Sequence, residues 1–341
     1  MKNILVVMTG GTIGSAARGG VIDVSEKAGG ELIERFRKET GERDVQFHVI
    51  RPMEMLSENC TPAHWRTLIT ALDGAGMAQY DGVIVTHGSD TLSYTASLLG
   101  YLYGGLGVPI VITASGAPLA DPRSNGVRNF AAAVALIKNE GLPGVFAVYE
   151  NSRSVMDVFL ATRLMEADLY TGDFSGFGGG PFGVMEGGRL KVCAREGSPP
   201  LDALKAPRPQ LRAPRAFESG VLAIAPYPGL DYTLFDLSRP DVKAVLHRLY
   251  HSSTACATPG RHALAEFIRR CRERGIEVFV QSVRGGRDMY VTAHEMLQAG
   301  AIALPMMSFE AAYVKLCLAV NQSELPVREF MLRPVYFEFV E

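Results

Sequence analysis

The sequence lacks any long apolar run and any excess of charge of one sign. No stretch approaches the roughly 18 apolar residues that a membrane-spanning helix needs. Lysine and arginine number 34 and aspartate and glutamate number 36, so the formal net charge is −2. A protein that binds nucleic-acid phosphates or an anionic membrane surface needs a basic surplus. We therefore expect neither nucleic acid nor membrane as a partner.

Cysteines are also few, and none of them forms a C-x-x-C pair. The chain has 5, an odd number, scattered over its length. This pattern argues against a disulfide scaffold and a clustered zinc site, and it is typical of a reducing compartment. The apolar run Ile4 to Met8 near the N-terminus is too short for the core of a signal peptide. We expect a cytoplasmic protein with neither a metal nor a cofactor.

The order of apolar runs predicts the fold class. The 341 residues correspond to about two domains at roughly 150 residues each. Short apolar runs alternate with amphipathic stretches, as in βαβ units around a parallel sheet. We predict an α/β protein with a larger N-terminal domain, built on a doubly wound and mostly parallel sheet, and a smaller C-terminal α/β domain. The predicted boundaries are 1–195 for the first domain, 196–218 for a proline-rich linker and 219–341 for the second domain.

Individual elements follow from the same periodicity. The predicted strands are Ile4–Met8, Gln46–Ile50, Val83–Thr86, Ile110–Thr113, Val145–Tyr149, Val221–Ala225 and Ile276–Val280. Thr61 and Pro62 predict the start of a helix that ends near Gly74, because Pro is favoured at the first helical position. Two further helices are predicted over Pro122–Lys138 and Pro259–Arg274, and a hairpin over residues 185–190.

A glycine-rich turn follows the first strand directly. Residues Thr9–Gly14 read T-G-G-T-I-G. Ligands of open α/β sheets bind outside the carboxyl ends of the strands, and glycines let a backbone turn tightly and point N–H groups into a cleft. The turn is neither G-x-G-x-x-G nor a P-loop, so it is weak support for a nucleotide site. Two readings stay open: a hydroxyl nucleophile beside an oxyanion hole, or a tight turn with threonine caps.

A second polar turn, Thr86–Thr91, follows the third predicted strand and reads T-H-G-S-D-T. Its hydroxyl and carboxylate can position a water or a substrate amine. Alternatively, Ser89 or Asp90 caps the following helix. His87, Ser89 and Asp90 do not read as a catalytic triad, because triad members meet across space and the G-x-S-x-G elbow is absent.

Together the two turns resemble the signatures of the bacterial-type L-asparaginases, most closely the cytoplasmic type I branch. Thr9–Ile13 matches the first signature, T-G-G-T-I. Residues 87–91 resemble the second signature, H-G-T-D-T, at the spacing of the family. Similar segments at residues 57–62, 109–126, 226–229 and 308–315 extend the resemblance over residues 4 to 320.

The resemblance implies an amidohydrolase that converts the side-chain amide of L-asparagine, or a related amide, to the acid and ammonia. Thr12 would be the first nucleophile, and Ser89 stands at the second catalytic threonine. Asp90 would accept a hydrogen bond from the substrate ammonium group, and Ser57 would bind its carboxylate. The implied catalytic residues are Thr12, Ser89, Asp90 and Arg163, and the implied substrate-binding residues are Gly11, Ser57, Glu58, Ser89, Asp90, Ser115 and Thr254. The family also implies a homodimer or homotetramer.

Three positions depart from the family pattern. Arg163 stands where the family has a lysine, and arginine keeps the charge without being a usable base. The segment after Gly14 contains no tyrosine, and Val21 falls near the expected place. Thr254 replaces an asparagine. These changes keep the nucleophile hydroxyls but alter their activation, so an altered amide substrate stays open, as does a protein on the same fold that binds an amino acid or amide without turnover.

Overall fold

The computed structural model describes residues 1–18, 21–24, 28–281 and 289–340. Contacts between residues divide the chain into two compact units, Met1–Ala213 and Pro214–Glu341. Within the described ranges, no helix is both long enough and apolar enough to cross a membrane.

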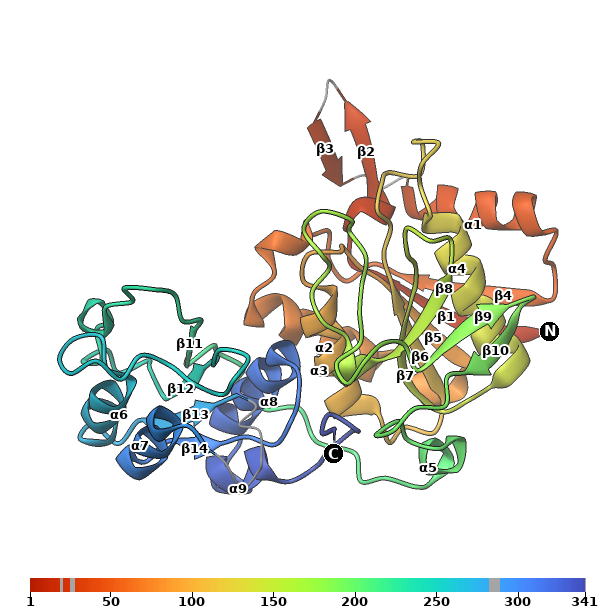
Figure 1. The fold of residues 1–341 in the computed structure, drawn as a ribbon. Helices are drawn as coiled ribbons and strands as arrows, with labels where there is room; N and C mark the ends of the chain where they lie inside the picture. The colour runs from red at the N-terminus through yellow and green to blue at the C-terminus, as the bar shows by residue number, and fades with distance from the viewer. Residues whose placement is uncertain (19–20, 25–27, 282–288, 341) are drawn as a thin grey trace. The chain divides into compact units, whose positions relative to one another are not determined.

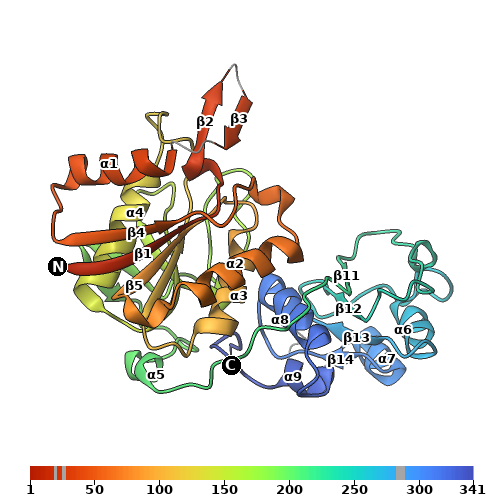
Figure 2. The same ribbon diagram turned by 180° about the vertical axis from the view of Figure 1, so that it is seen from behind.

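The first unit is built on an eight-stranded sheet with the order β10-β9-β8-β7-β6-β5-β1-β4 (Figures 1 and 2). Neighbouring strands from β4 to β7 pair in parallel, and β8, β9 and β10 continue the sheet in antiparallel pairs. A separate antiparallel pair, β2 and β3, follows β1 in the chain. The strands of this unit are β1 Lys2–Met8, β2 Ser15–Arg18, β3 Val21–Val24, β4 Val45–Ile50, β5 Gly82–Thr86, β6 Pro109–Thr113, β7 Gly144–Glu150, β8 Met156–Leu160, β9 Gly183–Glu186 and β10 Arg189–Val192.

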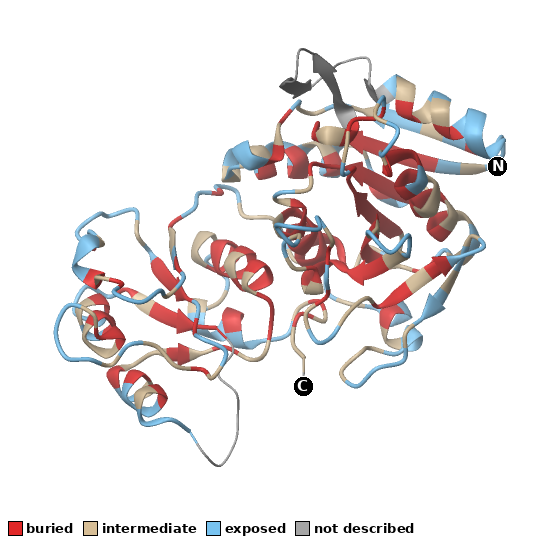
Figure 3. Cartoon of the chain, turned by 45° about the horizontal axis from the view of Figure 1, so that its top comes forward, coloured by how far each residue is buried: buried red, intermediate tan, exposed pale blue. Residues whose placement is uncertain are grey.

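Helices cover both faces of this sheet. They are α1 Ala28–Thr40, α2 Pro62–Gly74, α3 Leu92–Tyr103, α4 Gly126–Ala135 and the short α5 Leu201–Lys205. On one face α1 packs on α4, where the rings of Phe36 and Phe130 lie 5.4 Å apart. On the other face α2 is joined to α3, because Trp65 Nε1 donates to Thr95 Oγ1 at 3.0 Å. The sheet is therefore doubly wound, as predicted, and its central strands are buried on both sides (Figure 3).

The strand order reverses between β1 and β5. From β1 the chain moves outward to β4 at one edge, then returns past β1 and continues through β5, β6 and β7 in the other direction. Such a reversal leaves a crevice at the carboxyl ends of the two strands concerned, and ligands of open α/β sheets bind in that crevice. The turns Thr9–Gly14 and Thr86–Thr91 both lie at this point.

The second unit contains a four-stranded parallel sheet with the order β11-β12-β13-β14. Its elements are β11 Val221–Ile224, β12 Ala244–His247, β13 Glu277–Val280, β14 Ile302–Ala303, α6 Leu264–Arg272, α7 Val291–Ala299, α8 Phe309–Asn321 and α9 Val327–Leu332. Its core includes Tyr232 stacked on Phe267, with ring centroids 4.8 Å apart. An α/β fold in both units confirms the predicted fold class.

Some predicted elements differ from the structure. Helix α4 begins at Gly126 rather than Pro122, because Asp121 Oδ1 accepts from the Arg123 backbone N–H and holds this segment in a turn. Helix α6 likewise begins at Leu264 rather than Pro259. Within the proline-rich stretch 196–218, α5 forms and its Leu204 is buried, so this stretch is more structured than a plain linker. Its bounds as a linker stay a prediction.

A buried ion pair fastens the end of the chain to the second unit. Lys315 on α8 and Glu338 are both fully buried, and Lys315 Nζ lies 2.6 Å from Glu338 Oε1. Lys315 also donates to the Arg333 carbonyl and lies over the Phe339 ring, 4.4 Å from its centroid. Burial lowers the pKa of Lys315. A buried charge is costly without its partner.

We predict that Lys315→Met destabilises the second unit by about 3–5 kcal/mol, because Glu338 would be left buried and uncompensated. Hydrogen exchange of the α8 amides would measure this loss. The matched control is Arg239→Met in the same unit, which breaks an exposed ion pair with Asp241 and should change the stability of that unit by no more than about 1 kcal/mol. Equal effects of the two substitutions would contradict the assigned role of Lys315.

Candidate active site

The two glycine-containing turns contact each other backbone to backbone. Gly11 has a φ of +75°, and a Cβ at this position would overlap the backbone of His87 and Gly88. Gly10, with a φ of +103°, lies equally close to the backbone of Met55. Only glycine combines a positive φ with such an approach at little cost. The turn after β1 is therefore held between the turn after β5 and the segment after β4.

Hydrogen bonds fix this arrangement. The Gly11 N–H donates to the Met55 carbonyl at 2.8 Å, and the Met55 N–H donates to the Thr9 carbonyl at 3.0 Å. The Thr9 hydroxyl donates to the Thr86 carbonyl at 2.9 Å, which ties the end of β1 to the end of β5. Three chain segments thus meet at the reversal of strand order.

Ser57 lies against the second turn. A Cβ on Gly88 would overlap the Ser57 side chain, and the buried Ser57 hydroxyl lies 3.4 Å from Asp90 Oδ2 and accepts from the Asp90 N–H at 3.3 Å. The Thr91 hydroxyl donates to the Ser57 carbonyl at 2.9 Å. Ser57 begins a 3₁₀ turn that also carries the exposed Glu58. A carboxylate and a hydroxyl held side by side can bind opposite ends of an α-amino acid.

Thr12 and Ser89 each come directly after one of the two contacting glycines. Thr12 begins the 3₁₀ turn Thr12–Gly14 and is half-buried, as is Ser89. The contact between Gly11 and Gly88 therefore brings two hydroxyl side chains to the same end of the sheet. Helix α3 begins at Leu92 with Thr91 at its N-cap. The cap position thus belongs to Thr91, and Ser89 and Asp90 lie before it.

His87 is fully buried between these elements and α3. Its Nδ1 lies 2.8 Å from the Gly88 carbonyl, and its Nε2 lies 3.0 Å from Thr95 Oγ1. Burial lowers the pKa of His87 to about 4, so the ring is neutral at pH 7. Both ring nitrogens face these two partners, which agrees with the interpretation that His87 is not the base of a Ser–His–Asp triad.

Sequence reasoning did not find the partners of His87. Thr95, from the first turns of α3, lies against Nε2, and Trp65 of α2 bonds in turn to Thr95. Neither residue belongs to a motif. The signal that was present is a histidine that directly follows a strand buried at every position. A histidine in that place needs partners for both ring nitrogens, but the sequence does not say which residues supply them.

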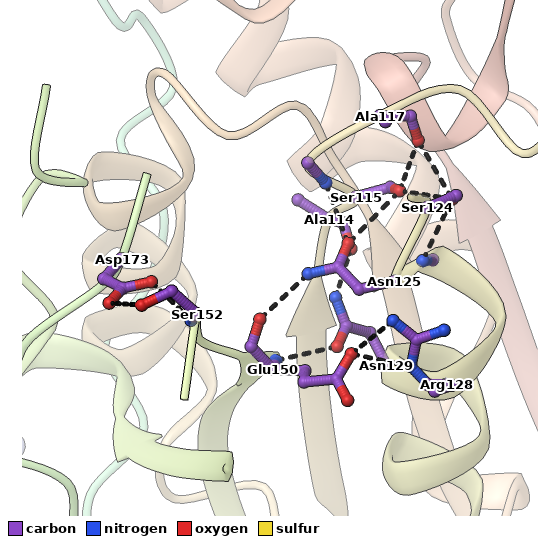
Figure 4. A network of polar contacts seen from close by, with 12 residues as sticks. Ala114, Ser115, Ala117, Ser124, Asn125, Arg128, Asn129, Glu150, Ser152 and Asp173 are labelled. Carbon is purple, nitrogen blue, oxygen red and sulfur yellow. Dashed lines mark hydrogen bonds and ion pairs between the residues drawn. The ribbon is translucent and has the colours of Figure 1, made fainter. Parts of the chain in front are cut away.

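Ser115 belongs to a polar network at the end of β6 (Figure 4). Its hydroxyl donates to the Ala117 carbonyl at 2.6 Å and lies 3.0 Å from the Ser124 hydroxyl. Asn125 joins this network to β7, because its Oδ1 accepts from the Gly116 N–H at 2.9 Å and its Nδ2 donates to the Glu150 carbonyl at 2.9 Å. These bonds shape the loop after β6. The substrate contact of Ser115 stays a prediction.

Three other residues singled out in the sequence come from other chain segments. Arg163 ends a 3₁₀ turn after β8 and its Nη1 donates to the Gly197 carbonyl at 2.6 Å. Its pairing with Asp90 stays a prediction. Thr254 belongs to the second unit, where its carbonyl accepts from the Tyr250 N–H at 3.0 Å. Val21 lies in β3, and its side chain is outside the described part of the structure.

Comparison with known proteins decides the family. The family model described as "Asparaginase, N-terminal" matches residues 3–195, more than half of the chain. The chain belongs to the asparaginase family. L-asparaginase 1 of Escherichia coli K12 is 29% identical over 94% of this chain and 92% of its own length.

Two other relatives show the range of the family. A subunit of the glutamyl-tRNA(Gln) amidotransferase of Aeropyrum pernix is 26% identical over 92% of this chain and 74% of its own length. The crystal structure of L-asparaginase I from Vibrio cholerae matches with a TM-score of 0.79 and 25% identity, over 100% of this chain and 99% of that one. The asparaginase resemblance seen in the sequence is thereby confirmed.

We predict that Gly11→Ala destabilises the first unit by about 1–3 kcal/mol more than Gly41→Ala. Both glycines have a positive φ, of +75° and +69°, but a Cβ at Gly41 would meet nothing within 4 Å. The shared cost of a left-handed residue is about 1–2 kcal/mol, and the additional cost at Gly11 is that of overpacking. Urea unfolding followed by Trp65, the one tryptophan of the chain, reports this unit. Equal losses of stability in Gly11→Ala and Gly41→Ala would contradict the close backbone contact at Gly11.

We also predict a pH dependence that originates from His87. Its folded pKa of about 4 lies below the unfolded value of about 6.5. The unfolded state therefore binds more protons between these values, and the free energy of unfolding falls as pH drops from about 6.5 to 4, by about 3 kcal/mol in total. Trp65 fluorescence in urea at each pH measures it. His87→Asn should show a shallower fall, and an unchanged slope in that variant would assign the effect to other groups.

Proposed function

We propose that this asparaginase-family protein is an amidohydrolase that hydrolyses the side-chain amide of L-asparagine, or a related amide, to the acid and ammonia. The observation that carries the proposal is the contact of Gly11 with Gly88. It supports the proposal because the turns that carry Thr12 and Ser89 meet at the reversal of strand order, and the Ser57 hydroxyl lies 3.4 Å from Asp90 Oδ2.

Recognition of the substrate follows from the charges at this point. The Asp90 carboxylate would accept a hydrogen bond from the α-ammonium group, and the Ser57 hydroxyl would donate to the α-carboxylate. The proposed substrate-binding residues are Gly11, Ser57, Glu58, Ser89, Asp90, Ser115 and Thr254. With the two ends of the amino acid held there, the side-chain amide would lie between Thr12 and Ser89.

The chemistry would proceed through an ester. The Thr12 hydroxyl oxygen attacks the amide carbon, its proton is passed to the amide nitrogen, and the carbon–nitrogen bond breaks to release ammonia. Water then attacks the ester carbon, which releases the acid and restores the hydroxyl. The carbonyl oxygen becomes negatively charged in both steps, and backbone N–H groups stabilise that charge. The N–H of Gly11 is occupied by Met55, so we assign this task to the N–H of Ser89.

Arg163 is proposed to act only through its charge. A guanidinium cannot take up a proton near neutral pH because it is already protonated. It would order the Asp90 carboxylate without a role in proton transfer. Arg163 also favours the second candidate function, a protein that binds an amino acid or amide without turnover. We further propose, from the family, a homodimer or homotetramer in the cytoplasm.

Ammonia release by the purified protein tests the proposal. The amides are L-asparagine, D-asparagine, L-glutamine, which the amidotransferase relative suggests, and N-substituted amides. We expect release from at least one of them, reduced at least about a thousandfold by Thr12→Ala. The control is Thr70→Ala, which removes an exposed α2 hydroxyl bonded to the Arg66 carbonyl and should leave activity unchanged.

Three other outcomes would be informative. Full activity in Thr12→Ala would remove Thr12 from the mechanism. No ammonia from any amide, with a rise in melting temperature on adding one of them, would support the binding protein instead. A protein that neither hydrolyses nor binds any of these amides would contradict both candidate functions.

A further inference from the structure

Four residues form a continuous buried chain of hydrogen bonds that ends on the second turn. Trp65 Nε1 donates to Thr95 Oγ1 at 3.0 Å, Thr95 Oγ1 lies 3.0 Å from His87 Nε2, and His87 Nδ1 lies 2.8 Å from the Gly88 carbonyl. Trp65, Thr95 and His87 are buried. The chain links α2 and α3 to the residue that contacts Gly11.

The partners determine the direction of every bond in this chain. A carbonyl oxygen only accepts, so Nδ1 of His87 carries a hydrogen and donates it to Gly88. The ring is neutral at pH 7 because burial lowers its pKa, so Nε2 carries a lone pair and the Thr95 hydroxyl donates to it. Thr95 in turn accepts from Trp65. The nearby Cys60 thiol is a weak competitor for the Thr95 proton, because burial raises its pKa and keeps it protonated, and the sulfur of a protonated thiol is a weak acceptor.

The Gly88 carbonyl and the Ser89 N–H belong to one planar peptide unit. A hydrogen bond to that carbonyl therefore also fixes the direction of the Ser89 N–H, which points the opposite way. Gly88 itself offers no side chain to hold this plane, and its neighbours Gly11 and Ser57 leave no room for one. The constraint has to come from the carbonyl side, where His87 is.

We propose that His87 is a positioning residue that locks the Gly88–Ser89 peptide plane, so that the Ser89 N–H is aimed at the oxygen that becomes negative during amide hydrolysis. This inference rests on the function proposed above. Thr95 supports the same tautomer, because its hydroxyl donates to Nε2 and holds the ring plane. With the hydrogen on Nε2 instead, the lone pair of Nδ1 would face the Gly88 oxygen and repel it.

Two substitutions of His87 separate this role from simple packing. In His87→Asn the amide nitrogen takes the place of Nδ1 and can still donate to Gly88. In His87→Gln the amide reaches the place of Nε2, so the bond to Thr95 can persist but the donor to Gly88 is lost. We expect His87→Asn to keep kcat within a few-fold, and His87→Gln to lower kcat by about 10- to 100-fold with KM changed less than about threefold, since oxyanion stabilisation acts on the transition state.

Two substitutions of Thr95 test the positioning role of His87 independently. Thr95→Val keeps the shape but removes the hydroxyl that donates to Nε2 and holds the orientation of the ring, and Thr95→Ser restores that hydroxyl. We expect kcat to fall about tenfold in Thr95→Val and to recover in Thr95→Ser. Equal kcat in His87→Asn and His87→Gln, or equal kcat in the two Thr95 variants, would overturn the positioning role. So would losses that appear in KM alone.

A measurement without turnover keeps this inference separate from the proposed function. The Thr12→Ala protein is labelled with ¹⁵N-histidine and studied by NMR. The His87 signal is identified as the one that is missing from the double variant that also carries His87→Gln. We expect a neutral ring with hydrogen on Nδ1 at pH 7, and the same tautomer in Thr95→Val, because the Gly88 carbonyl accepts only from a protonated Nδ1. Hydrogen on Nε2, or a charged ring, would overturn the inference even in an active enzyme. If the ring has the expected tautomer but the protein hydrolyses no amide, the result contradicts the proposed function and not the assigned state of His87.

Discussion

The candidate site depends on the close approach of two backbones, at Gly11 and Gly88. Neither turn forms the proposed site alone, because each carries one of the two proposed catalytic hydroxyls, and the residues proposed to bind an amino acid come from several chain segments. The approach needs glycine on both sides: Gly11 for its positive φ and its contact with residues 87 and 88, and Gly88 for its contact with Ser57. A methyl group at either position would push the hydroxyls apart, so the two glycines matter to the site as much as the hydroxyls do.

The topology of the sheet supplies the place for that approach. The parallel order β4-β1-β5-β6-β7 puts the ends of β1 and β5 side by side where the strand order reverses.

One connection between strands has an unusual hand. The steps from β5 to β6 and from β6 to β7 run in the same direction across the sheet, yet α3 and α4, the helices of these two connections, cover opposite faces (Figures 1 and 2). These two crossovers therefore have opposite hands, and one of them departs from the right-handed rule.

The sequence predicted those features that depend on local composition. Strands β1, β5, β6 and β7 are apolar runs buried on both faces, so their ends were placed within two residues. Antiparallel β8 was missed, because Asp157 interrupts its apolar run. The start of α4 was placed too early because the Asx turn at Asp121 imitates a helix start.

The same distinction between local pattern and packing applies to the residues of the candidate site. Thr12, Ser89 and Asp90 could be proposed because they stand in recognisable turns after strands, and Ser57 because its segment resembles one of the family. The sequence did not predict the role of Trp65 and Thr95, because their hydrogen bond forms only once α2 and α3 pack together. The opposite hands of the two crossovers were equally out of reach, since no residue pattern encodes the face on which a helix packs.

The most direct test of the account is a crystal structure of the protein with L-aspartate, the acid that hydrolysis of L-asparagine would release. The account predicts the α-ammonium group on Asp90, the α-carboxylate at Ser57 and the side-chain carboxylate between Thr12 and Ser89, with one oxygen facing the Ser89 N–H. L-aspartate bound elsewhere in the first unit, or bound here in the reverse orientation, would contradict it.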